Sequence, residues 1–497
     1  MELDYKIDSI LELCGSSQQI IVRRFAIGKE NPVDAALVYK DGLVNQDIIN
    51  RDILNPLMHT VNEDISKIQL INEEVCNKYI SMSKISIQTD INMVVKDIRR
   101  GKTAILIYKT DNFIIADTMG GEHRNISEPL DEVGIRGPKN GFIENIQINL
   151  SLIKEGLKDK NLVIENLIVG RRSQRDVALI YIEDIADKDL IEDIRNRISS
   201  VDVDAITSMG MLEQYIENYP YSIFPQGYAS QRPDVVQQNL TEGRIALLLD
   251  GTPFALTVPA LFIEFFQAGE DYSQRTIISN LNRMIRVFGT LIVITLPSIY
   301  LALIRYNAEL IPVKFVIPII QSRRGIALPP LLEILSMQVV VELLREGGLR
   351  LPSKIGQTLS VVGGFIIGSA ALQANLVSPA TLVIVGVATI GTFIIPSYDM
   401  SISIRLISFP FLFLTNFLGA FGLIAGWYFV FVHLLSLDSF GVPYLSLDKY
   451  NDLKDMFIRI PLWEMNKRPE GIPNNDPIRQ TDFRNKFWGK KDEKGSK

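Results

Sequence analysis

The hydrophobic pattern changes partway along the chain. Residues 1–240 carry short apolar runs separated by charged residues, as in a water-soluble protein. Later segments are long and almost wholly apolar, namely Val287–Ile304, Ile355–Ala374, Pro379–Pro396 and Phe409–Leu437. Because a helix needs roughly 20 apolar residues to cross a bilayer core, these segments predict a polytopic membrane domain behind a large soluble region.

The soluble region begins with helix and strand patterns that predict a first α/β lobe. Ile91–Arg99 has the spacing of an amphipathic helix, and the basic pair followed by Gly101 fits a helix C-terminus. Two apolar runs, Thr103–Tyr108 and Phe113–Asp117, flank a polar turn. This arrangement predicts a β-hairpin directly after the helix.

A second α/β lobe is predicted further along the soluble region. Ile143–Leu157 has one apolar face and predicts a helix, and Leu162–Val169 and Val177–Ile182 pattern as strands around a basic turn. Asp187 is placed to cap a helix over Lys188–Ile198, because its carboxylate can accept the first free backbone N–H groups. The predicted fold class is therefore a two-lobed α/β N-terminal region followed by an α-helical polytopic membrane domain.

These patterns place the first lobe at 1–130 and the second lobe with a linker at 131–240. The helical membrane domain follows at 241–440 and a C-terminal tail at 441–497. At the start of the membrane domain, Ile245–Phe266 is apolar but contains prolines and acidic residues. A charge at the bilayer centre costs about 2.5–3.5 kcal/mol, so we expect a re-entrant or interfacial element there.

The distribution of cations predicts the orientation in the membrane. Lys and Arg favour the cytoplasmic side. Arg275, Arg283 and Arg286 precede the first apolar helix, and Lys449 and Lys454 follow the last. We therefore expect an even number of crossings, with the soluble region and the C-terminal tail on the cytoplasmic side. The N-terminus lacks the pattern of a secretory signal, which agrees with this expectation.

Small and polar residues gather on one face of the Ile355–Ala374 segment. Gln357, Ser360, Gly364 and Gly368 recur at helical spacing, and the two glycines form a Gly-x-x-x-Gly step. This step favours close helix packing, because small residues let backbones approach. The same face would also suit a narrow water-filled path. The four residues are candidate pore-lining residues, and Gly363 and Gly364 are candidate gating positions because they offer little resistance to bending.

Asp250 and Glu264 are the acidic candidates of the predicted re-entrant element. Several copies of the chain would bring these carboxylates into an acidic ring at a cation vestibule. The alternative is structural pairing with Arg244, Arg275 or Arg283. The sequence leaves both possibilities open.

Composition excludes several classes of function. A net charge of −6 predicts no nucleic-acid partner. The two cysteines, Cys14 and Cys76, are far from metal-ligand spacing and are expected to be reduced thiols. The chain has no phosphate-binding glycine loop and no His-Glu-x-x-His motif, so we expect no enzyme activity and no cofactor.

Three ordered groups of residues together resemble a known family. The first contains Arg136-Gly137-Pro138 with Gly141 and Phe142, the second contains Arg232-Pro233-Asp234 with Gly251 and Pro253, and the third contains Glu346-Gly347-Gly348 with Gly356-Gln357-Thr358. In this order and spacing the chain resembles the A subunits of the GerA-family bacterial spore germinant receptors. The N-terminal lobe matches only in its general pattern.

The resemblance implies a multi-pass subunit in the inner membrane of the spore. Its partners would be a polytopic B subunit and a lipoprotein C subunit, with nutrient recognition mainly in the B subunit. The A subunit would form a homo-oligomer that acts as a ligand-gated cation channel and releases ions when germinant binds. The alternative is a non-conducting scaffold or signalling subunit that docks the other subunits through its soluble lobes.

Overall fold

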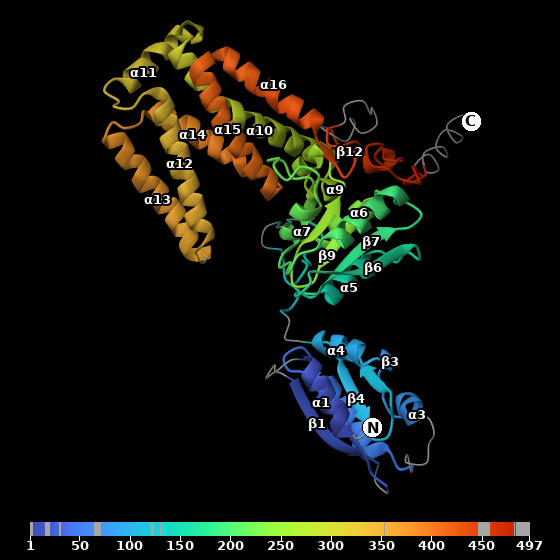
Figure 1. The fold of residues 1–497 in the computed structure, drawn as a ribbon. Helices are drawn as coiled ribbons and strands as arrows, with labels where there is room; N and C mark the ends of the chain where they lie inside the picture. Colours follow the sequence, from blue (N-terminus) through green and yellow to red (C-terminus); the bar gives the residue numbers. More distant parts are fainter. Residues whose placement is uncertain are drawn as a thin grey trace, which may run out of the picture. The chain divides into compact units, whose positions relative to one another are not determined.

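A computed structural model describes residues 3–14, 20–28, 31–63, 71–120, 124–129, 132, 134, 136–351, 353–445, 458–481 and 483. The chain divides into two compact units, Met1–Arg124 and Asn125–Lys497. The first unit is one α/β lobe (Figure 1). The second unit contains another α/β lobe, a helical region and residues 458–481, here called the C-terminal segment.

The first lobe is a five-stranded antiparallel sheet in the order β1-β2-β4-β5-β3. Helices α1 and α4 cover one face, and α3 with two π-helical turns covers the other. Alternate strand residues therefore point into two separate apolar layers. The elements are β1 (Ile20–Ile27), β2 (Val33–Lys40), β3 (Ile85–Gln88), β4 (Thr103–Ile107), β5 (Phe113–Ala116), α1 (Leu3–Cys14), α2 (Gln46–Ile48), α3 (Ile71–Lys78), α4 (Ile91–Arg99) and the turns Ile49–Leu54 and Pro56–Thr60.

The second lobe is also a five-stranded antiparallel sheet, in the order β6-β7-β9-β10-β8. Helices α5 and α8 cover one face, and α6 and α7 cover the other. The elements are β6 (Leu162–Val169), β7 (Arg175–Ile182), β8 (Tyr228–Ser230), β9 (Ile245–Leu249), β10 (Ala255–Val258), α5 (Ile146–Gly156), α6 (Lys188–Ser200), α7 (Met209–Ile216) and α8 (Pro233–Thr241). The predicted cap is confirmed, since the Asp187 side chain accepts hydrogen bonds from two backbone N–H groups at the start of α6.

The predicted re-entrant element at Ile245–Phe266 is wrong. Its first part forms β9 and β10, which pair with each other and, through β7, belong to the sheet of the second lobe. Every residue of both strands is buried. A strand buried on both faces is a continuous apolar run, so its pattern matches that of a membrane element. The membrane domain therefore does not begin at residue 241.

The two lobes share one topology and one register. Each sheet residue of the first lobe corresponds to the residue 142 positions later, so the pair Ile20–Lys40 becomes Leu162–Ile182. Gly101 follows the C-cap residue of α4, and Gly243 follows that of α8. Both glycines have positive φ, at 91° and 98°. The soluble region is thus an internal repeat.

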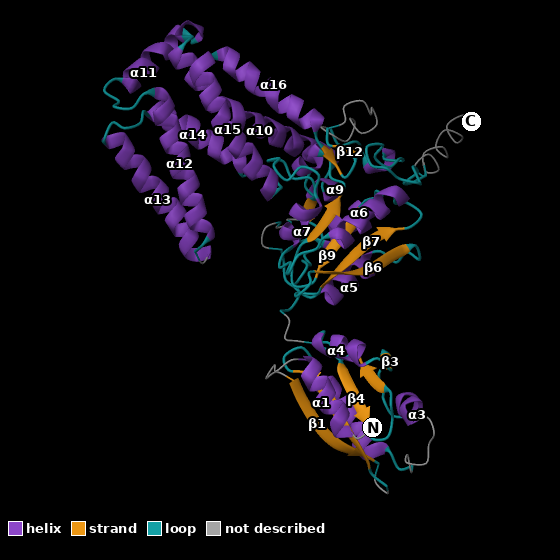
Figure 2. Ribbon diagram, viewed as in Figure 1, coloured by secondary structure: helices purple, strands orange, loops and turns teal. Residues whose placement is uncertain are grey.

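The C-terminal half of the second unit is helical (Figure 2). Helix α10 packs against α14 and α15, and α12 packs against α13. The elements are the 3₁₀ turn Phe262–Phe266, α9 (Glu270–Ser273), α10 (Thr276–Arg305), the 3₁₀ turn Ala308–Leu310, α11 (Val313–Arg323), α12 (Pro330–Leu349), α13 (Ser353–Gln373), α14 (Pro379–Thr392), α15 (Tyr398–Leu418), α16 (Ala420–Ser436), β11 (Asp438–Ser439), β12 (Val442–Pro443) and the 3₁₀ turn Leu462–Glu464.

Among the described residues, α10 and α15 are long and apolar enough to cross a membrane. Val361–Gln373, α14 and α16 are shorter apolar helices. The predicted apolar run Phe409–Leu437 is divided between α15 and α16 at Gly419, whose φ of 62° favours glycine. The predicted segment Val287–Ile304 lies within α10, and the segments Ile355–Ala374 and Pro379–Pro396 overlap α13 and α14 but extend past their ends.

Candidate functional site

The predicted pore helix is α13, which packs against α12. Gly364 and Gly368 border a mostly apolar cavity of about 380 Å³ between α12, α13 and α14. A Cβ added at Gly364 would have no neighbour within 4 Å, and at Gly368 the nearest atom, in Leu382, is 3.8 Å away. Packing within this chain therefore does not require glycine at either position. Gly363 is half-buried, and the side chains of Gln357 and Ser360 lie outside the described residues.

Apolar side chains of α13 are exposed beside the glycines and on the opposite side of the helix. The exposed fractions are 68% for Val361, 76% for Phe365 and 57% for Ile366. Exposure on this scale is unfavourable in water and is normal against lipid or a second protein chain. Because Val361 is seven residues before Gly368, it lies on nearly the same side of the helix, so the small-residue face is bordered by exposed apolar side chains.

The two acidic candidates both lie at structural positions, Asp250 in the second lobe and Glu264 in the 3₁₀ turn that follows it. Asp250 is in the turn between β9 and β10, where its carboxylate accepts a hydrogen bond from the Ile146 amide at 3.3 Å. Glu264 forms a buried ion pair with Arg244. The structural alternative, pairing with Arg244, is the arrangement found for Glu264, and we do not retain either acid in the proposed pore.

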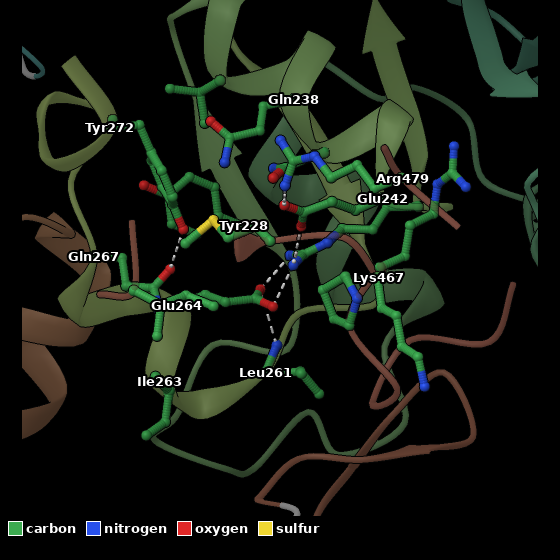
Figure 3. A pocket seen from close by; sticks show the side chains of 18 of the residues that line it. Tyr228, Gln238, Glu242, Leu261, Ile263, Glu264, Gln267, Tyr272, Lys467 and Arg479 are labelled. Carbon is green, nitrogen blue, oxygen red and sulfur yellow. Dashed lines mark hydrogen bonds and ion pairs between the residues drawn. The ribbon is translucent and has the colours of Figure 1, made fainter. Parts of the chain in front are cut away.

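Arg244 links the second lobe to the segment that leads into the helices. Its side chain is 4% exposed and contacts Glu264 of the 3₁₀ turn and, at 3.1 Å, Glu242 at the end of α8. Arg479 of the C-terminal segment approaches Glu242 at 3.6 Å. Figure 3 shows Glu264 and Glu242 on either side of this network, with Arg479 beside Glu242.

Asp271 in α9 connects the same region to the start of α10. Its carboxylate is 3.3 Å from Nε of Arg283 and 2.6 Å from Nη1 of Arg286, both on α10. Its backbone carbonyl accepts a hydrogen bond from Arg459 of the C-terminal segment at 2.5 Å. Asp271 therefore joins α9, α10 and the C-terminal segment, and neither spacing nor composition pointed to it.

Helix α7 of the second lobe carries an unusual carboxyl group. Burial first, and then the carboxylates of Asp399 and Glu217, raise the pKa of Glu213 to about 8. Asp399 lies at the start of α15, so the helical region faces α7 here. At neutral pH Glu213 is therefore largely protonated in the folded protein.

Ionisable residues are also buried within the helical region. Glu333 of α12 is fully buried and accepts hydrogen bonds from Arg323 at 2.9 Å and from the Ser378 amide at 2.6 Å. Glu342 contacts Arg345 at 3.2 Å and Arg405 at 3.1 Å. Sequence reasoning assigned these residues no role. Their position within apolar helices was the signal, because intramembrane ionisable residues are commonly functional.

The first two motif groups meet at the start of α8. The Arg232 guanidinium is buried, contacts Asp234 at 2.7 Å and lies against Gly137. Pro233 occupies the first turn of α8, where its missing N–H costs nothing. The backbone N–H of buried Phe142 donates to the Gln231 carbonyl at 2.8 Å. These contacts give the motif a structural role.

The other residues of the first two groups lie outside helices and strands, whereas the third group lies in α12 and α13. Gly141 packs so closely on Ser127 and Pro129 that a Cβ would approach the Ser127 carbonyl oxygen to 2.9 Å. Gly251 has a φ of 83° in the β9–β10 turn, and Pro253 follows it. Arg136 and Pro138 are exposed.

Comparison with known proteins supports the predicted resemblance. The family model described as Bacillus/Clostridium GerA spore germination protein matches residues 8–471. Spore germination protein KA of Bacillus subtilis is 38% identical over 94% of this chain and 86% of its own length. Spore germination protein GerLA of Bacillus cereus is 34% identical over 93% of this chain and 94% of its own length.

A solved structure is also similar. The N-terminal domain of the A subunit of the Bacillus megaterium spore germinant receptor GerK3 is 31% identical, with a TM-score of 0.22. The match covers 52% of this chain and 94% of that domain. Because the family model spans nearly the whole chain, this protein belongs to the GerA family of spore germination proteins.

Proposed function

We propose that this protein is a membrane subunit of a nutrient-sensing spore germination receptor and forms an oligomeric, ligand-gated cation channel. Germinant binding to a partner subunit opens the channel, and ions leave the spore core. Family membership supports the role in germination. The observation that carries the channel is the small-residue face of α13, where Gly364 has open space around it.

The pore between subunits is proposed to lie along this face of α13. Glycine is replaceable at Gly364 as far as contacts within this chain are concerned, so its use there fits a role outside the chain's own packing. A small residue lowers the steric barrier to water next to a helix. The exposed apolar side chains of the same helix, such as Val361 and Phe365, suit contact with lipid or a neighbouring copy. A ring of α13 helices therefore gives the pore.

Gating is proposed as a shift between a closed and an open ring, with Gly363 and Gly364 as the positions of bending. Moving such an equilibrium from 1:99 to 99:1 requires about 5.5 kcal/mol of differential binding free energy. Several subunits that change together can supply this, each through a modest contribution. The partners are a polytopic B-type subunit and a lipoprotein C-type subunit.

The protein is proposed to lie in the inner membrane of the spore, with the lobes and the C-terminal segment on the cytoplasmic side. Arg468 donates to the Thr241 carbonyl in α8, and Arg459 donates to the Asp271 carbonyl in α9. These hydrogen bonds support a common side for the second lobe and the C-terminal segment. A common side requires an even number of crossings. Arg275, Arg283 and Arg286, which lie at the start of α10, favour the cytoplasmic face.

The test uses spores that carry the complete receptor. Gly364→Leu is expected to reduce nutrient-triggered release of monovalent cations by at least about tenfold, because a leucine narrows the water path. Gly347→Leu in α12 is the matched control, since a Cβ there also meets nothing within 4 Å. Equal release from both variants, at equal receptor abundance, would remove α13 from the pore.

The second candidate function is a non-conducting scaffold that docks the other subunits through its lobes. Both sheets end on eight-residue edge strands, β1 and β6, and an edge strand can pair with another chain. A scaffold predicts that leucine is tolerated along all of α13. The Gly364→Leu experiment therefore distinguishes the two functions.

A further inference from the structure

A cavity of about 380 Å³ lies where three parts of the second unit meet. The second lobe contributes Tyr228 and Arg244, the segment before α10 contributes Tyr272, and the C-terminal segment contributes Asn466 and Lys467. In Figure 3, Gln267 and Tyr272 lie on one side of the cavity, and Lys467 and Arg479 lie on the other. A cavity of this size suits a small organic molecule.

Two buried polar atoms on the cavity wall have no partner among the described atoms. One is Nε of Arg244, a residue that is 3% exposed, and the other is Oδ1 of Asn466. An unsatisfied buried donor or acceptor costs about 1–3 kcal/mol. A ligand that satisfies both must offer an acceptor to Arg244 and a donor to Asn466.

The charge of the wall indicates the sign of the ligand. The cations are Arg244, Lys467, Arg468 and Arg479, and the acids are Glu242, Glu264 and Glu464. The balance is one net positive charge. Lys467 is exposed at the wall, where no described carboxylate pairs with it. These features favour a monoanion, while the rings of Tyr228 and Tyr272 favour an apolar or aromatic body.

We propose that this cavity binds a small organic carboxylate with an apolar or aromatic body, and that its binding clamps the C-terminal segment onto the second lobe. The carboxylate lies toward Arg244 and Lys467. A hydroxyl or amine at the other end donates to Asn466. This site is separate from the pore of α13 and does not depend on it.

The clamp follows from the origin of the walls. Asn475 donates its backbone N–H to the Ile185 carbonyl at 2.8 Å and its side-chain amide to the Ala186 carbonyl at 2.7 Å, so the segment already forms part of the lobe. Tyr272 packs under the guanidinium of Arg283 on α10, 5.6 Å from the ring centroid. A ligand that contacts Tyr272 and Lys467 therefore touches the C-terminal segment and, through Tyr272, is next to α10.

The probes are three compounds with one shape and three charges: 4-hydroxyphenylacetate, its neutral amide and tyramine. Each is titrated against the full-length protein in lipid nanodiscs by isothermal calorimetry. A parallel trypsin digestion measures cleavage after Lys467. We expect the carboxylate to bind, to slow cleavage at this site, and to bind more tightly than the amide or the amine.

Three variants sharpen the test. Lys467→Ala is expected to weaken carboxylate binding about three- to fivefold, as for an exposed charge. Asn466→Leu, nearly equal in size, removes the acceptor for the ligand's donor group and is expected to weaken it about three- to tenfold. Lys188→Ala, an exposed lysine on α6, is the matched control and should bind as the wild type does.

Equal binding of all three probes, or unchanged carboxylate binding in both Lys467→Ala and Asn466→Leu, would overturn the proposal. Absence of binding and of protease protection with every probe would also overturn it, and would leave the cavity to solvent. Ion release in the Gly364→Leu experiment is independent of either result.

Discussion

The two lobes have the same strands in the same register, yet they close their sheets differently. In the first lobe the chain returns after β5, so that Gly120 donates its backbone N–H to the Leu43 carbonyl at 3.1 Å. In the second lobe the chain leaves after β10 for the helices. Asn475 of the C-terminal segment takes the corresponding place and donates to Ile185 at 2.8 Å. The first lobe is thus closed by residues that directly follow β5, whereas the second lobe is closed by the C-terminal segment.

The same divergence appears at the residue after each helix-ending glycine. Lys102 in the first lobe contacts Asp97 of its own helix α4 at 2.8 Å. The corresponding Arg244 has Asn239 at the position of Asp97, and its partner is Glu264, outside the sheet. A local, partly exposed pair has become a buried pair that joins the lobe to the helical region.

The largest expected effect comes from breaking this pair. Arg244→Ala leaves the buried carboxylate of Glu264 without its cation, which costs about 3–5 kcal/mol. Lys102→Ala breaks a partly exposed pair and is expected to cost less than about 1 kcal/mol. Hydrogen exchange of β9 in the first variant and of β4 in the second measures both. Similar exchange in the two variants would contradict the difference between the lobes.

The repeat itself predicts equal core costs. Leu37 and Leu179 occupy corresponding positions, and both are 0% exposed. Leu37→Ala and Leu179→Ala are each expected to cost about 2–5 kcal/mol. Hydrogen exchange of the sheet that carries each substitution gives the comparison. A difference well above 1 kcal/mol between the two would show that the cores are not equivalent.

A smaller effect is expected where the C-terminal segment closes the second lobe. Asn475→Ala removes the side-chain hydrogen bond to the Ala186 carbonyl, worth about 0.5–1.5 kcal/mol. The segment should then detach more often, and trypsin should cleave after Lys467 several-fold faster. Cleavage at the wild-type rate would argue against closure by this segment.

The last prediction depends on pH. The pKa of Glu213 is about 8 in the folded protein against an ordinary value of 4.5. A raised folded pKa gives stability that is complete below the ordinary value and is lost as the pH rises through about 8. Glu213→Gln removes this dependence, so its melting temperature should gain on the wild type between pH 5 and 9. A constant difference would mean that Glu213 titrates normally.

Local sequence patterns predicted much of the fold. Helix α4 has the predicted bounds, and the hairpin β4–β5 and the cap at Asp187 are found as expected. Each of these depends on neighbours in the sequence. The repeat is also visible in the sequence, since Ala36-Leu37-Val38-Tyr39 recurs as Ala178-Leu179-Ile180-Tyr181.

The rest of the fold and of the candidate site depends on contacts between residues that are distant in sequence. Buried strands β9 and β10 have the composition of a membrane element, and only their pairing with β7 places them in a sheet. Nothing near Asn475 indicates Ile185 as its partner. Asp271 and Glu333 are single acids whose cationic partners are set by the tertiary fold.

The most direct test of the channel is the conductance of the purified receptor in a planar bilayer with nutrient present. The account predicts a cation current in the wild type and in Gly347→Leu, and its loss or strong reduction in Gly364→Leu. An unchanged current in Gly364→Leu, or no current from an intact and nutrient-bound receptor, would contradict it.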